Sequence, residues 1–125
     1  MPNDCDSPLH PLARLGIARF NNGEYWLAHE ALEDAWIAET ASIRDLYRGI
    51  LQTAVVYYHI SQNNFVGALK VYQRSQKWLD KWPAICCGVD VDQLRTDLDA
   101  AIIEVRRLGA EDLAEFDLYP QINLI

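Results

Sequence analysis

Residues 43–62 constrain the fold more than any other part of the chain, because they are apolar on nearly every side when read as a helix. With 3.6 residues per turn, the large apolar side chains cover three faces: Leu46, Ile50, Ala54 and Tyr57; Tyr47, Leu51 and Tyr58; and Val56 and Ile60. A helix with this pattern is surrounded by other helices. The segment therefore predicts the central helix of a helical bundle.

Four further helices are expected around it. Apolar stripes at helical spacing and turn signals place them at about 11–20, 24–39, 63–82 and 90–108, the last ending before Gly109. No segment shows strand alternation bounded by hairpin turns, and the connections are short, which favours antiparallel hairpins. The sequence predicts an all-α, single-domain bundle of about five helices over residues 1–125. We expect residues 1–8 to be a flexible lead-in and residues 110–125 to be a tail packed on the bundle.

Composition excludes several classes of function. The net charge of −7 argues against nucleic-acid binding, because phosphates would be repelled. The longest apolar stretch, residues 49–60, is too short and too polar for a membrane span, and residues 1–8 lack the features of a signal peptide. Three cysteines without paired spacing make a disulfide framework improbable. We expect a cytoplasmic protein without a cofactor, since no phosphate-binding loop or nucleophile motif is present.

A polar ridge runs along the otherwise apolar central helix. Arg48, Gln52 and His59 fall on one line, at positions i, i+4 and i+11. Buried polar groups need partners. The helix at 24–39 offers three: His29, Glu30 and Glu33. We expect Arg48 to pair with Glu30 or Glu33, and Gln52 to bridge to His29.

Three interpretations of this cluster remain open. It is a hydrogen-bonded network that fixes how two helices cross, or a ligand-binding or catalytic pocket, or a metal site made by His29, Glu33 and His59. In an antiparallel pair the two histidines are offset by roughly 9 Å along the helices, which is too far for a shared ion. The spacing therefore favours the network, with His59 bound elsewhere, near Asn63 or Asn64.

Two surface features point instead to an interaction module. Trp26 and Trp78 lie off the apolar faces of their helices, where they would line a groove or an oligomer contact. The helix at 63–82 carries a basic stripe, which is an ordinary solvated face or a docking site for an acidic partner: Lys70, Arg74, Lys77 and Lys81. A ligand-binding domain should open its polar cluster into a cleft, whereas a module should expose an aromatic or charged groove.

A short pattern occurs twice, 40 residues apart, each time after an Asn-Asn pair. The residues are Tyr25, Ala28, Leu32 and Ala35 in the first copy, and Phe65, Ala68, Tyr72 and Ser75 in the second. Two copies are too few for a repeat array. We interpret them as two helices that solve the same packing problem.

Three ordered motifs resemble a known family. Residues 20–36 read FNNGEYWLAHEALEDAW, residues 47–54 read YRGILQTA and are followed by Tyr58-His59, and residues 64–68 read NFVGA. Together they are similar to the small prokaryotic and plastid family catalogued as domain of unknown function 309. The resemblance implies an all-helical bundle and no particular activity. The motif positions of the family fall on the following residues: His29, Glu30, Glu33, Arg48, Gln52, His59 and Asn64.

The sequence thus favours a small helical domain that binds a small ligand at this cluster. The alternative is a protein-interaction module in which the cluster is only structural. An enzymatic role and a homo-oligomer both stay open.

Overall fold

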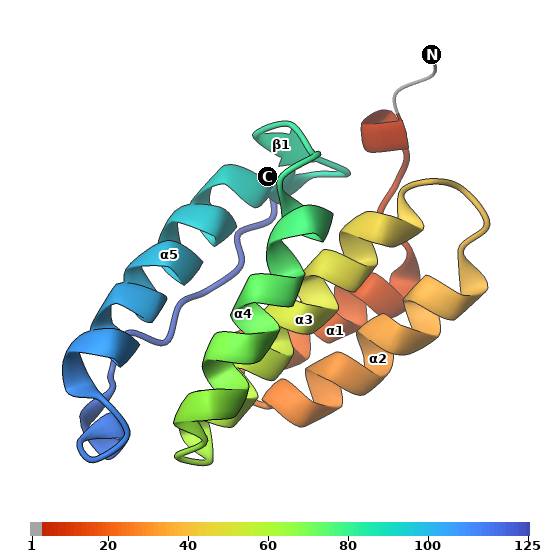
Figure 1. The fold of residues 1–125 in the computed structure, drawn as a ribbon. Coiled ribbons are helices and arrows are strands. Elements are labelled where there is room, and N and C mark those ends of the chain that lie inside the picture. Colours follow the sequence, from red (N-terminus) through yellow and green to blue (C-terminus); the bar gives the residue numbers. More distant parts are fainter. Residues whose placement is uncertain (1–3) are drawn as a thin grey trace.

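The computed structural model describes residues 4–125, and five α-helices make up most of them (Figure 1). Their bounds are α1 (Pro11–Asn21), α2 (Tyr25–Ala38), α3 (Arg44–Ser61), α4 (Phe65–Leu79) and α5 (Val91–Leu108). Two short 3-10 helices, η1 (Asp4–Asp6) and η2 (Leu113–Glu115), and two two-residue strands complete the elements. The predicted all-α bundle is confirmed. No helix in this part of the chain is long and apolar enough to cross a bilayer.

Helices α1 to α4 form consecutive hairpins, with α3 between α2 and α4 (Figure 1). As the apolar pattern predicted, α3 is the central helix: its buried residues are Leu46, Tyr47, Gly49, Ile50, Thr53, Ala54, Val56, Tyr57 and Ile60. A Cβ on Gly49 would lie 2.8 Å from a methyl group of Leu79, so the glycine permits the close approach of α4. Five of the half-buried residues of α3 recur every three or four positions along one side of the helix: Arg44, Arg48, Gln52, Val55 and His59.

Helix α4 ends three residues earlier than its sequence predicted. We expected it to reach Trp82, next to Pro83, but it ends at Leu79. The Arg95 guanidinium donates hydrogen bonds to the Leu79 and Trp82 carbonyl oxygens, at 2.9 and 2.7 Å. Because α5 supplies a donor for these carbonyl groups, the chain can leave the helix without burying them unpaired.

The connector between α4 and α5 contains a small hairpin that we did not expect. Strand β1 (Ile85–Cys86) pairs antiparallel with β2 (Val89–Asp90). The two residues between them, Cys87 and Gly88, have φ angles of 52° and 76°. Positive φ at both positions is the geometry of a type I′ turn, which joins antiparallel strands with two residues.

A disulfide joins this hairpin to the N-terminal segment. The sequence had made a disulfide framework improbable, and this expectation is corrected. Cys5 of η1 is bonded to Cys86 of β1, 81 positions away, and the Cys87 amide donates to the Cys5 carbonyl oxygen at 2.7 Å. Cys5 and Leu9 are buried. Residues 4–8, which we expected to be a flexible lead-in, are therefore held on the bundle. Residues 1–3 of that lead-in lie outside the described part.

The C-terminal tail returns along the bundle to the same hairpin (Figure 1). The Asn21 side chain accepts from the Ile122 amide at 2.7 Å and donates to its carbonyl oxygen at 2.9 Å. Further on, the Ile125 amide donates to the Gly88 carbonyl oxygen at 2.7 Å. Both ends of the described chain thus meet at the β1–β2 hairpin.

Candidate interaction surface

Arg48 lies between two tryptophan rings instead of beside a carboxylate. Its guanidinium carbon is 5.1 Å from the centre of the Trp36 ring on α2 and 4.3 Å from that of Trp78 on α4. Among residues 4–125, no ion pair joins Arg48 to Glu30 or Glu33, so the charge pair that we expected is not formed. The arginine ties three helices together through cation–π contacts.

His29 contacts two residues of its own helix, α2. Its Nε2 atom donates to a Glu33 carboxylate oxygen at 3.2 Å, and its ring stacks on Trp26 with centroids 4.5 Å apart. The expected bridge to Gln52 is not formed. His29 Nδ1 and Gln52 Oε1 are both buried, and neither has a hydrogen-bond partner in the described part of the chain. Within the described residues, the contacts of the imidazole are thus with Trp26 and Glu33 of its own helix.

His59 is bound by Asn64, as the sequence suggested. The Asn64 side-chain amide lies 3.2 Å from His59 Nδ1, which accepts its proton in the tautomer that carries hydrogen on Nε2. The same Asn64 side chain caps α4 by accepting from the Gly67 amide at 2.9 Å. Burial lowers the pKa of His59 below its ordinary value, which favours this neutral form.

The seven predicted residues therefore fall into separate groups. His29 and Glu33 are together on α2, while Glu30 is exposed on its outer side. Arg48 lies between its two tryptophans, and His59 and Asn64 form their own pair at the α3–α4 turn. In residues 4–125 no group of three or more His, Cys, Asp or Glu side chains could hold a metal ion. The candidate set His29, Glu33 and His59 is not assembled.

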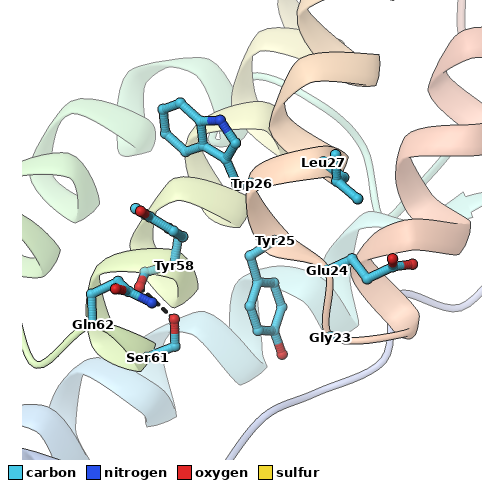
Figure 2. A pocket seen from close by; sticks show the side chains of 8 residues that line it. All are labelled: Gly23, Glu24, Tyr25, Trp26, Leu27, Tyr58, Ser61 and Gln62. Carbon is cyan, nitrogen blue, oxygen red and sulfur yellow. Dashed lines mark hydrogen bonds between the residues drawn. The ribbon is translucent and has the colours of Figure 1, made fainter.

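Two hollows of the structure have Trp26 in their lining. One of about 300 Å³ lies between the start of α2 and the end of α3 (Figure 2). Trp26 stands at one side of it, and its lining is mostly apolar and aromatic: Gly23, Glu24, Tyr25, Trp26, Leu27, Tyr58, Ser61 and Gln62. A second hollow, of about 250 Å³, is acidic and has Trp26 on its edge: His29, Glu30, Glu33 and Asp34.

Trp26 is exposed but held in place. It is 48% accessible, and its ring contacts the rings of His29 and Tyr58, with centroids 4.5 and 5.0 Å away. Beneath it, burial and the neighbouring Tyr119 raise the pKa of Tyr25 to about 12, so that hydroxyl stays neutral. The sequence marked Trp26 as lying off the apolar face, but it did not reveal Tyr58 as its neighbour, because that contact joins different helices.

The basic stripe on α4 borders a third hollow. It measures about 450 Å³ and is lined by Lys70, Gln73, Arg74 and Lys77. At the far end of the stripe, Lys81 forms an ion pair of 2.6 Å with Asp45 at the start of α3. Lys77 lies 4.9 Å from the centre of the Trp78 ring. Only part of the stripe is thus neutralised by the surrounding residues.

These features define an all-α protein made of consecutive helical hairpins, with an aromatic and charged surface over α2, α3 and α4. The model of the family described as "Domain of unknown function (DUF309)" matches residues 13–71, from α1 into α4. This match confirms the resemblance seen in the motifs over residues 13–71.

One relative is an "Uncharacterized protein" of Aquifex aeolicus (strain VF5), 23% identical over 84 residues. The match covers 66% of this chain and 25% of the relative, so the chain spans about a quarter of that protein's length.

Proposed function

We propose that this chain is a protein-binding module that uses the outer face of α2 and the hollow beside Trp26. The exposed but fixed Trp26 side chain carries the proposal. Tryptophan is enriched among the residues that dominate binding energy at protein interfaces. Because its two ring contacts hold Trp26 in one position, a partner would lose little of its binding energy in ordering that side chain.

The apolar and acidic residues of this surface indicate which kind of protein segment would bind to it. The hollow of about 300 Å³ beside Trp26 has a mostly apolar lining and a size that suits one inserted side chain. Helix α2 carries three acids, Glu30, Glu33 and Asp34, and neither lysine nor arginine. Opposite charges across an interface speed encounter and set the register. The surface therefore suits a protein segment that presents an apolar side chain flanked by basic residues.

A small ligand is the second candidate, and the buried, unpartnered His29 Nδ1 favours it. Small-molecule sites enclose most of their ligand's surface. The hollows around Trp26 and His29 are shallow and open to solvent, which suits a protein surface better. The expected cytoplasmic setting stays a prediction, and the Cys5–Cys86 disulfide is of a kind more frequent in oxidising compartments.

Affinity capture with matched variants tests the proposal. The wild-type protein, Trp26→Ala and Ile103→Ala would be used as baits, with bound proteins quantified by mass spectrometry. Ile103 is the control because it is 68% exposed and lies on α5, away from the surface. We expect Trp26→Ala to lose a partner that Ile103→Ala retains, with both variants melting like the wild type. Equal capture by all three baits would refute the module.

A further inference from the structure

The solvent faces of α2 and α4 carry opposite charge. Helix α2 has three acids and no lysine or arginine, whereas α4 has Lys70, Arg74 and Lys77 and no acid. Helix α3 lies between them (Figure 1). In residues 4–125 no ion pair connects α2 with α4. The charges of these two faces are therefore not paired with each other within one copy of the chain.

Both faces show the same spacing of exposed residues. On α2 the stripe is apolar, acid, acid, apolar: Trp26, Glu30, Glu33 and Ile37. On α4 it is apolar, base, amide, base: Val66, Lys70, Gln73 and Lys77. In each stripe the residues stand at i, i+4, i+7 and i+11, which is one face of a helix. Ile37 and Val66 are 63% and 57% exposed, so each stripe also presents apolar surface.

The two stripes lie at matching levels. Helices α2 and α4 each run antiparallel to α3 (Figure 1), and each follows a turn of three residues. The pattern that recurs 40 residues later faces the core in both helices: Tyr25, Ala28, Leu32 and Ala35 are buried, as are Ala68 and Ser75, while Phe65 and Tyr72 are partly buried. Equal spacing of the core positions places Trp26 level with Val66, and Glu30 level with Lys70.

We infer that the partner of this surface is a second copy of the chain, bound about a two-fold axis parallel to α3. Such an axis keeps every residue at its own level and lays α2 of each copy over α4 of the other. Trp26 then meets Val66, and Glu30 meets Lys70, twice in each dimer. A two-fold contact of this kind closes on itself and leaves no open edge.

This inference rests on the proposed function, because it supplies the partner whose chemistry that proposal described. Val66, with Lys70 one turn further on, is an exposed apolar side chain flanked by a base. Exposed ion pairs are screened by salt. We therefore expect dimerisation to weaken as salt concentration rises, while the apolar Trp26–Val66 contact persists.

A charge-swap experiment tests it. One variant carries Glu30→Lys and Glu33→Lys, and the other carries Lys70→Glu and Lys77→Glu. In each variant alone, both α2–α4 contacts bring like charges together, and we expect a monomer by sedimentation equilibrium. In a mixture each α2 meets an α4 of opposite charge, so a heterodimer should form. Glu111→Lys with Glu115→Lys, two exposed acids after α5, is the matched control and should remain dimeric.

Three results would overturn the inference: a wild-type monomer at the highest concentration reached, a dimer that survives in both variants, or a mixture that stays monomeric. The proposed function fails separately. If the wild type is monomeric while Trp26→Ala still loses a captured protein, only the inference falls. If the mixture pairs but Trp26→Ala neither weakens the dimer nor alters capture, the assignment of binding to Trp26 falls instead.

Discussion

The cap of α4 makes a sharp test of the structure, because it couples two residues with opposite effects on stability. Asn64 accepts from the Gly67 amide at 2.9 Å. A Cβ at position 67 would lie 2.6 Å from Asn64 Nδ2 and 2.8 Å from its Cγ. Alanine at position 67 would therefore push the capping side chain away. This explains why an asparagine and a glycine stand three residues apart in the motif at 64–68.

Two known effects set the expected magnitudes. Replacing glycine by alanine within a helix stabilises by about 1 kcal/mol. Losing an asparagine cap costs about 1 kcal/mol, with a range of about 0.5–2 kcal/mol. Gly67→Ala in the wild type should thus change the free energy of unfolding by about zero, since the two effects offset each other. In an Asn64→Ala background the cap is already absent, so Gly67→Ala should stabilise by about 1 kcal/mol.

Urea unfolding of the four proteins of this cycle, followed by circular dichroism, would measure the coupling. Glu24→Ala is the control, because Glu24 stands at the N-cap of α2 without a capping hydrogen bond from its side chain. We expect it to change stability by only a few tenths of a kcal/mol. If Gly67→Ala stabilises equally with and without Asn64, the cap geometry is wrong.

Three further changes have expected outcomes. Arg48→Met removes the contacts with Trp36 and Trp78 and should cost about 1–2 kcal/mol in urea unfolding. Burial lowers the pKa of His59 from its ordinary 6.5, so the unfolded chain binds the proton more tightly. Its contribution to stability is complete above about pH 6.5 and decreases as the pH falls toward the folded-state pKa, and His59→Gln should remove this component from a stability–pH profile. Cys5→Ser opens a loop of 81 positions, for which chain entropy predicts a loss of up to about 4.5 kcal/mol and measured disulfides give about 2–4 kcal/mol, seen as a lower melting temperature.

The helices could be predicted from sequence because burial repeats with the helical period. The small hairpin could not, since strands of two residues are too short to show alternation, and its turn uses Cys87 at a positive φ, where glycine or asparagine is the usual signal. The disulfide joins residues 81 positions apart, and no local pattern links them.

For the polar ridge, the sequence identified the residues but assigned some of the wrong partners. The bond between His59 and Asn64 was predicted because both lie in one short turn. The partners of Arg48 were wrong because they depend on how α2 and α4 are rotated about their axes. Periodicity shows which residues share a face of one helix. It does not show that the face with Glu30 points to solvent while Trp36 points to Arg48.

The pattern that recurs 40 residues later in α4 accounts only for the buried residues of the two helices. Packing against α3 explains why the buried positions repeat after 40 residues, but it places no condition on the exposed ones. A solubilising surface usually mixes charges of both signs along one helix. Here three acids lie on α2 and three bases on α4, and the exposed apolar Trp26 and Val66 each follow the first residue of the repeated pattern. Because α3 keeps these charges apart within one chain, their separation by sign points to a contact made outside it.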